Sequence, residues 1–498
     1  MAGHQAGASP SEPGFEGRSP APGQLVPATG AWRPGDPVGH RQFHRIGAFR
    51  PERGGLIDVT VAYETWGRLN AARDNAVLVL HALTGDSHIR GPAGPGHPTS
   101  GWWTDLIGPG AAVDTDRYFV VAPNVLGGCQ GTTGPASAPG PAFGSGPAFG
   151  SGPARRSGAA LEPGPARGSG AALEPGPARR SGAALGSGPA AGSPPASESG
   201  RASGSGPAAG SPPVPESGRA SGSGAPDAAA GSPGLPDLHD AAAGRPYGSR
   251  FPFITVRDQV RVELALADAL GIPQFALVIG GSMGGMRVLE WAIMAPERVA
   301  RIAPVATTAK STADQIAWAH AQISAIRGDP NFLGGDYYSQ PDGQGPHVGL
   351  GIARQIAHTT YRSAAELESR FGADAQTGEQ PLGGGGRYAV ASYLEHHAAK
   401  LALRFDANSY IVLTEALCAH DVGRDRSSVA QALARITARP LVVAFDSDRL
   451  YLPRESEELA RLIPGADGVH VVHSDYGHDG FLIEFAQLAP AITAFLAS

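Results

Sequence analysis

The sequence contains few cysteines and few charged residues, and both shortages limit what the protein can be. Only two cysteines, Cys129 and Cys418, occur among 498 residues. This excludes a disulfide framework and favours a reducing compartment, so we expect a cytoplasmic location. Charged residues make up 17% of the chain, and the formal net charge is -6. The basic surface typical of nucleic-acid or membrane binding is therefore not expected, and small molecules are the expected partners.

Long apolar runs are also missing. No stretch of about 18 apolar residues occurs, and the chain does not begin with a basic segment followed by an apolar one. We therefore expect neither a transmembrane helix nor a secretory signal peptide.

Glycine and proline are abundant, with 71 and 45 copies, and they concentrate in two segments. Residues 1–44 are too poor in branched apolar side chains to offset the entropy of ordering, which predicts a disordered tail. Residues 136–244 contain the unit GPARRSGAALEP, which recurs with small changes. Each unit offers one leucine, so stacked units would bury little apolar surface. We predict a disordered insertion that interrupts one domain, because the longer connection costs only about 2 kcal/mol in loop closure.

Outside these segments, short apolar runs alternate with helical patterns. Such runs are typical of strands that are buried on both faces of a parallel sheet. They occupy residues 76–83, 118–125, 275–281, 441–448 and 469–475. Helical spacing of the apolar residues covers 256–271 and 286–295. The sequence therefore predicts an α/β fold with helices on both faces of a mostly parallel sheet.

One region departs from this alternation. Residues 308–439 are rich in helical patterns and lack strand runs, which predicts a helical cap domain inserted between two strands of the sheet. The core that remains consists of residues 45–135, 245–307 and 440–498.

The strongest motif is Gly280-Gly281-Ser282-Met283-Gly284. It directly follows a strand run and precedes a helical pattern, which is the context of a nucleophile elbow. Small neighbours are needed there because the serine adopts strained backbone angles. A phosphate-binding loop is the alternative, but neither GxxxxGK[ST] nor GxGxxG spacing is present. We predict that Ser282 is a nucleophile whose hydroxyl stands above the sheet.

A nucleophilic serine needs a base that takes its proton and an acid that orients the base. Asp448 follows a strand run, and His478 lies in the loop YGHDG after the last run. The order Ser, Asp, His is that of the α/β-hydrolase fold. Asp446 and His473 are competing candidates, but both are expected on strands, so Asp448 and His478 are the predicted catalytic partners of Ser282.

The tetrahedral oxyanion needs two donors that are already in place. The elbow supplies the backbone amide of the residue after the nucleophile, which is Met283. The second donor should come from another turn after a strand, and HALTGDSH offers the amide of Leu83.

With these residues in view, the sequence resembles the homoserine O-acetyltransferase family, hydrolase-fold acyltransferases of methionine biosynthesis. The resemblance covers about residues 55–135 and 246–498. It rests on the blocks HALTGDSH, GWWTDLIGPG, NVLGGCQGTTGP, SRFPFITVRDQV, VIGGSMGGMRVLEWA, ASYLEHHAAKLALRFDANSYIVLTEAL and YGHDGFL. It implies ping-pong transfer of acetyl from acetyl-CoA, a co-substrate, to L-homoserine through acyl-Ser282, with no other cofactor. It also suggests a homodimer formed through the cap.

The resemblance further implies how the amino-acid substrate is held. Arg354 matches the ligand of its carboxylate, and Asp479 matches the ligand of its ammonium group. Tyr361 and Thr84 match further polar contacts. From the residues alone, Tyr361 and Thr84 would be interpreted as residues that form hydrogen bonds within a helix or loop, and Arg354 as part of a solvated helix face.

Three alternatives stay open. An esterase would use the same catalytic residues, and a related transferase would use succinyl-CoA or accept L-serine. A protein that only binds partners through the repeat segment is the third. No metal is expected, because HExxH is absent and Glu395-His396-His397 is interpreted as a helix surface.

Overall fold

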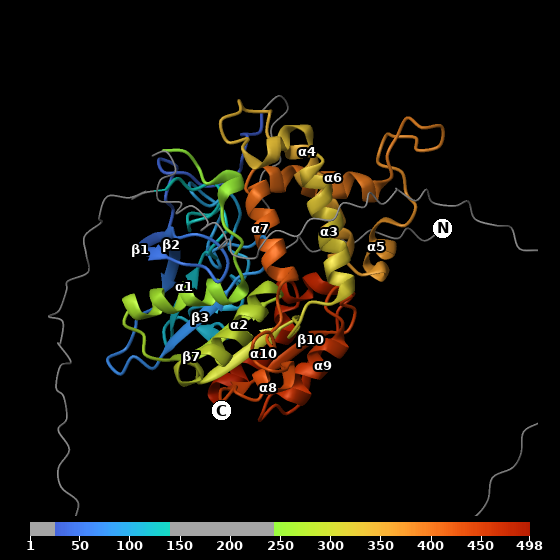
Figure 1. Cartoon of the computed structure of the whole chain (residues 1–498). Coiled ribbons are helices and arrows are strands. Elements are labelled where there is room, and N and C mark those ends of the chain that lie inside the picture. The colour runs from blue at the N-terminus through green and yellow to red at the C-terminus, as the bar shows by residue number, and fades with distance from the viewer. Residues whose placement is uncertain (1–24, 140–243) are drawn as a thin grey trace, which may run out of the picture. The chain divides into compact units, whose positions relative to one another are not determined.

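The computed structural model describes residues 25–139 and 244–498. The described residues belong to one compact unit, which is drawn in colour in Figure 1. The insertion expected over residues 136–244 lies outside the described residues except at its two ends.

A nine-stranded sheet forms the centre of the described unit, and β4 and β5 pair separately. The described strands are β1 Gln42–Phe49, β2 Ile57–Trp66, β3 Ala76–Leu80, β4 Ile107–Gly108, β5 Val113–Asp114, β6 Phe119–Pro123, β7 Phe275–Gly281, β8 Arg301–Val305, β9 Arg439–Pro440, β10 Val442–Phe445 and β11 Val469–Val472. The sheet order is β1-β2-β6-β3-β7-β8-β10-β11, with β9 beside β8. The β1–β2 and β2–β6 pairings are antiparallel, and the remaining pairings are parallel.

Helices make up most of the rest of the described chain. They are α1 Val256–Ala269, α2 Met283–Met294, α3 Ala313–Arg327, α4 His347–Tyr361, α5 Ala364–Phe371, α6 Ala389–Ala402, α7 Ala407–Cys418, α8 Val429–Leu433, α9 Pro453–Leu462 and α10 Phe485–Ala497. Short 3-10 segments occur at η2 Gly248–Arg250, η3 Pro296–Arg298, η4 Pro330–Gly335 and η5 Gly477–Leu482. None of these helices is both long enough and apolar enough to cross a bilayer.

Both faces of the central parallel strands β3, β7, β8 and β10 are buried, whereas β11 at the edge of the sheet is only partly buried, which corrects the expectation for that run. In β3, Ala76, Leu78 and Leu80 belong to an apolar cluster that includes residues of α1 and α2. Val77 and Val79 belong to a second cluster that includes residues of α10. Successive side chains of a strand point to opposite faces, so a strand covered on both sides has to be apolar throughout. The predicted α/β architecture is confirmed.

Local sequence signals set the limits of the helices. The hydroxyl of Thr255 accepts a hydrogen bond from the amide of Asp258, whose carboxylate accepts one from the amide of Thr255. This capping box satisfies two amides that α1 itself cannot pair. The helix ends shortly before Gly271, which has a φ of 67°, a backbone angle that favours glycine.

The chain between β8 and β10 is mainly helical. Figure 1 shows α3, α4, α6 and α7 gathered beside one another, while α1 and α2 lie against the sheet. Toward the end of this region, Leu433 and Ile436 pack in the same apolar cluster as α1 and α2. The last part of the range 308–439 therefore packs with the core, and the limits of a separate cap domain stay a prediction.

The tail expected over residues 1–44 differs from the structure in its second half. Residues 25–44 are described, and the start of β1 lies among them. The Thr29 hydroxyl donates to the Asp406 carboxylate at 2.8 Å, and Ala31 is buried. Asp406 is the N-cap residue of α7, so the hydrogen bond joins segments that are almost four hundred residues apart. Composition does not reveal such partners, so the prediction of disorder was wrong for this part.

Candidate active site

The turn that carries Ser282 lies between β7 and α2. Ser282 has a φ of 57° and a ψ of -123°, a strained conformation that only the surrounding structure can hold. Added Cβ atoms on Gly280 and Gly284 would lie 2.7 Å and 2.0 Å from the carbonyl oxygen of Leu80. Glycine is therefore required at both positions, and the motif adopts the predicted elbow.

His478 and Asp448 form a buried pair at this end of the sheet. Nδ1 of His478 lies 2.7 Å from Oδ2 of Asp448, and both side chains are at most 3% exposed. Asp448 follows β10, and its Oδ1 accepts hydrogen bonds from the amides of Leu450 and Tyr451 at 2.9 Å each. The carboxylate is thus fixed by the backbone before it contacts the imidazole.

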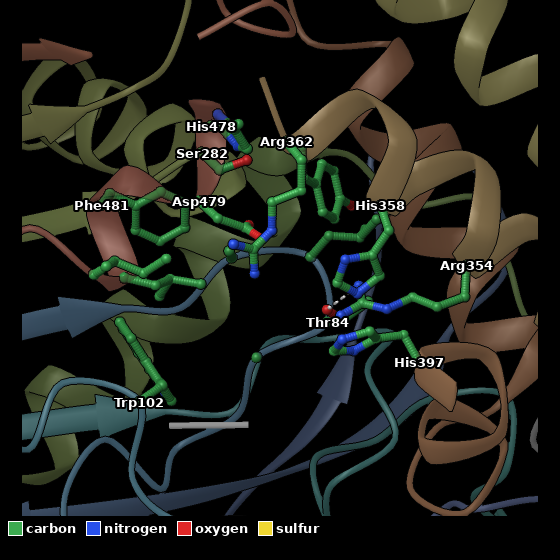
Figure 2. Close-up of a pocket in the computed structure, with 16 residues that line it drawn as sticks. Thr84, Trp102, Ser282, Arg354, His358, Arg362, His397, His478, Asp479 and Phe481 are labelled. Carbon is green, nitrogen blue, oxygen red and sulfur yellow. Dashed lines mark hydrogen bonds and ion pairs between the residues drawn. The ribbon is translucent and has the colours of Figure 1, made fainter. Parts of the chain in front are cut away.

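The environment of His478 strengthens its affinity for a proton. Burial lowers the pKa of His478, but the charge of Asp448 and its hydrogen bond outweigh burial and hold the pKa above its usual value. Because Nδ1 faces Asp448, Nε2 is the nitrogen left for Ser282. Figure 2 shows Ser282 and His478 next to each other in the wall of one pocket.

The competing candidates form a pair of their own. Nδ1 of His473 lies 2.8 Å from Asp446, but the two side chains are 82% and 43% exposed. Both residues come directly after β11 and β10 rather than within those strands, which corrects the expected placement. They lie outside the pocket that contains Ser282. An exposed pair is surrounded by water, so it cannot shield a reacting base.

The two predicted oxyanion donors are Met283, which directly follows Ser282, and Leu83, which lines the same pocket as Ser282. Met283 is the first residue of α2, and the first amides of a helix have no partner within it. Leu83 follows β3 in a turn and lines the pocket. These positions support the oxyanion hole, which stays a prediction.

A buried ion pair supports the turn that contains Leu83. Arg287 of α2 is fully buried, and its guanidinium donates to the carbonyl oxygen of His81 and, at 2.6 Å, to the carboxylate of Glu263. The indole of Trp291 donates to the same carboxylate at 2.7 Å. The helix that begins after Ser282 therefore also holds the start of the turn that contains Leu83.

We expect Arg287→Met to lower the free energy of unfolding by about 3–5 kcal/mol, because Glu263 would be left buried without its cation. Urea unfolding measures this loss. Arg327→Met removes an exposed partner of Glu415 and should cost at most about 1 kcal/mol. Adding Glu263→Gln should recover part of the loss from Arg287→Met. Equal costs for the two arginine variants would contradict a structural role for the buried pair.

All four predicted substrate contacts line the pocket: Arg354, Asp479, Tyr361 and Thr84. Arg354 is 6% exposed, and its Nη1 lies 3.4 Å from the Thr84 hydroxyl. Its guanidinium carbon lies 5.7 Å from the centre of the Tyr361 ring. The interpretation of Arg354 as a solvated helix residue is therefore wrong, and Figure 2 shows it reaching into the pocket.

Arg362 is a pocket residue that sequence reasoning missed. Its Nε lies 3.1 Å from Oδ2 of Asp479, and its Nη1 donates to Glu366 at 3.0 Å. Asp479 thus already has a cationic neighbour before any substrate ammonium arrives. No spacing signal in the sequence predicts this pairing, because the two residues come from distant segments.

Two buried histidines also line the pocket, His358 of α4 and His397 of α6. Their rings lie 4.1 Å apart. The interpretation of Glu395-His396-His397 as a helix surface is correct for the first two residues and wrong for His397. A signal for His358 was present, because it follows Arg354 by four positions and therefore lies on the same helix face.

One group of possible metal ligands is compact within the described residues: Glu64, His88 and His97, with donor atoms within 4.8 Å of one another. The two imidazoles stack at 3.9 Å with planes 12° apart, so their in-plane lone pairs cannot converge on one ion. Nδ1 of His88 instead lies 3.1 Å from Glu64. Burial lowers the pKa of His88, but Glu64 outweighs it and keeps the pKa raised. We interpret the group as a buried ion pair.

Comparisons with known proteins show the fold family and the relatives of the chain. Residues 75–485 match the family model of the alpha/beta hydrolase fold. The homoserine O-acetyltransferase of Thermobifida fusca (strain YX) is 48% identical over 95% of this chain and 98% of its own length. The protein of that name from Leifsonia xyli subsp. xyli (strain CTCB07) is 47% identical over 92% and 90%.

Solved structures share the architecture at lower identity. A homoserine O-acetyltransferase from Bacillus anthracis has a TM-score of 0.65 at 21% identity, covering 92% of this chain and 97% of that one. Esterase E22 has a TM-score of 0.64 at 22% identity, covering 92% and 99%. Likeness at this level of identity shows the fold alone.

The sheet, the elbow serine and the matched model define an α/β-hydrolase-fold protein. Sequence identity to the relatives narrows this class further. The chain belongs to the homoserine O-acetyltransferase family.

Proposed function

We propose that the protein transfers an acetyl group from acetyl-CoA to the hydroxyl of L-homoserine, giving O-acetyl-L-homoserine and CoA. The names of the relatives specify the acetyl group and the homoserine acceptor. We also propose that the reaction is a step of methionine biosynthesis and that the protein is cytoplasmic.

The main support for the proposal is that Arg354 is a buried cation without an anionic partner among the described residues. Its guanidinium is buried in the pocket of Ser282, and no carboxylate of the described residues lies within ion-pair distance of it. A buried cation without an anion is costly. An acceptor that carries a carboxylate would supply the missing charge, and a planar carboxylate suits a guanidinium. A neutral ester would leave Arg354 unpaired.

The first half of the reaction acylates Ser282. His478 Nε2 takes the proton of the hydroxyl as Oγ attacks the thioester carbonyl, and Asp448 stabilises the imidazolium that forms. The amides of Met283 and Leu83 bind the oxyanion. When the carbon–sulfur bond breaks, the proton passes from His478 to the leaving CoA sulfur.

The second half transfers the acetyl group to the acceptor. Arg354 binds the carboxylate of homoserine and Asp479 its ammonium group, with Thr84 and Tyr361 as further polar contacts. His478 takes the proton of the acceptor hydroxyl as its oxygen attacks the acyl carbon. The ester bond to the enzyme then breaks, and the proton returns to the serine oxygen.

The test is mass spectrometry of the intact protein mixed with acetyl-CoA or succinyl-CoA, followed by homoserine, L-serine or water alone. An acetyl adduct that homoserine discharges supports the proposal. A succinyl adduct, or discharge by serine, would indicate the related transferases. Rapid discharge by water would indicate an esterase, and no adduct from either donor would contradict the covalent mechanism.

We expect Arg354→Gln to raise the KM for homoserine by about 10- to 100-fold, because a charge-assisted contact to the carboxylate is lost. The rate of acetylation by acetyl-CoA should change little, since that step precedes acceptor binding. Steady-state kinetics and the mass of the acyl-enzyme measure the two effects. Arg327→Gln, an exposed arginine of α3, is the matched control. An unchanged KM in Arg354→Gln would remove the main support for the assigned acceptor.

We also propose that the protein is a homodimer joined through its helical region. Val348 and Ile352 lie one turn apart on α4 and are 68% and 42% exposed. Exposed apolar side chains at this spacing form a stripe that suits a helix-to-helix contact. Sedimentation of the full chain tests the proposal, and a monomer at all concentrations would contradict it.

A further inference from the structure

His358 occupies an unusual place in the pocket. It lies on α4 between Arg354 and Tyr361, and it is 3% exposed. Neither of its ring nitrogens has a hydrogen-bond partner among the described residues. Buried polar groups in folded proteins are nearly always paired, so an unpaired imidazole that lines a pocket indicates a partner that arrives with the ligand.

The neighbours of His358 are aromatic or cationic. Its ring lies 4.1 Å from that of His397, 5.8 Å from Tyr393 and 5.9 Å from Tyr361. Burial lowers the pKa of His358 well below its usual value, and the charge of Arg354 lowers it further. The ring is therefore neutral and offers one N–H donor and one acceptor nitrogen.

The N–H donors of His358 and Arg354 lie close to each other in the pocket. Figure 2 shows the Arg354 guanidinium close to the rings of His358 and His397, and reaching toward Thr84. A guanidinium has donors only, so it cannot pair with the N–H of the imidazole. A group with two acceptor oxygens and a negative charge would satisfy both residues at once.

We propose that His358 donates a hydrogen bond to the carboxylate of the acceptor, on the oxygen that Arg354 leaves free, and so contributes to selecting amino-acid acceptors. The inference rests on the proposed function, because it takes Arg354 as the carboxylate ligand. It adds a specificity-determining side chain to the acceptor site. The two residues are four apart on α4, so one helix face presents both donors.

The test compares the wild type with His358→Leu, His358→Asn and His358→Gln. His358→Leu should raise the KM for homoserine by about 10- to 100-fold, the effect of losing one hydrogen bond to a charged group. The rate of acetylation by acetyl-CoA should stay unchanged. At least one of the two amide variants should recover part of the loss, because each retains an N–H donor. His396→Leu, an exposed neighbour on α6, should leave the KM unchanged.

A second acceptor separates carboxylate recognition from a general disturbance of the pocket. The compound 3-amino-1-propanol is homoserine without its carboxylate. With this acceptor, the wild type and His358→Leu should have equal kcat/KM. An unchanged homoserine KM in His358→Leu, or an equal loss with both acceptors, would overturn the inference.

Failure of the inference can be told from failure of the proposed function. Wild type that is not acetylated by acetyl-CoA would overturn both. Wild type that is acetylated and discharged by homoserine, together with an unaffected His358→Leu variant, would overturn the role of His358 alone. Thermal unfolding of each variant identifies any loss that comes from misfolding.

Discussion

Replacing Ser282 with alanine should lower kcat for acetyl transfer by about 10⁵- to 10⁶-fold, the scale at which removal of a serine nucleophile stops covalent catalysis. The reason is the turn between β7 and α2. Its strained serine carries the single hydroxyl of the elbow, and it lines the same pocket as His478. Without that oxygen no acyl-enzyme forms. CoA release and the mass of the protein after mixing with acetyl-CoA measure the two consequences.

The structure of the variant should be intact, because alanine is only one atom smaller than serine. Ser369→Ala changes an exposed serine of α5 and should keep full activity and the acetyl adduct. An adduct of normal yield in Ser282→Ala would place the nucleophile elsewhere. A normal rate without any adduct would indicate direct transfer between the substrates.

Much of the fold could be predicted because the central parallel strands are buried on both faces. The runs that predicted β3, β6, β7 and β10 are apolar over most of their length, as strands buried on both faces must be. β11 was predicted as well, although it lies at the edge of the sheet and its Val471 is 42% exposed. Strand β8 was not predicted, because it is short and contains Pro304, a residue that argues against a central strand. The β1–β2 pair was also missed, since it lies at the edge and its first strand is only partly buried.

The same holds for the candidate site. Its features that depend on short motifs or on chain order could be predicted, whereas contacts between distant segments could not. The elbow is a local motif, because its serine and glycines stand in five consecutive residues between a strand run and a helical pattern. The pair of Asp448 and His478 follows from chain order, since the carboxyl ends of neighbouring parallel strands meet at one edge of the sheet. Both were accessible to reasoning from the sequence.

The residues that helices contribute to the pocket were harder to predict from the sequence. Arg362 contacts Asp479 across more than one hundred residues of sequence, and His397 enters the pocket from α6. Which face of a helix is buried depends on the helices packed around it, and here α4 and α6 cover each other. Polar residues on such faces look exposed in the sequence until the packing is known.

The second large effect is expected for Asp448→Asn, which should lower kcat by about 10⁴-fold. The cause lies in the two amides of Leu450 and Tyr451, which both donate to Oδ1. Asparagine must place its oxygen there, because an NH₂ group cannot accept those bonds. Its NH₂ group then faces Nδ1 of His478 and donates to it. The ring proton is held on Nε2, and the base can no longer accept the serine proton.

The remaining activity should also change with pH in a defined direction. The charge of Asp448 raises the pKa of His478, so its removal lowers that pKa. A base with a lower pKa stays deprotonated in more acidic solution, and the acidic limb of the kcat profile should therefore move to lower pH. Rate measurements across the pH range in which histidine titrates give both the loss of rate and the shift.

Asp446→Asn is the matched control, because it makes the same change in a carboxylate that contacts a histidine at 2.8 Å. That pair is largely exposed, and water can replace either partner, so its loss should change kcat by less than about threefold. Equal losses in the two variants would mean that both carboxylates act on the fold rather than on the base. A loss confined to Asp448→Asn without the acidic shift would assign the carboxylate to orienting His478, with little influence on its proton affinity.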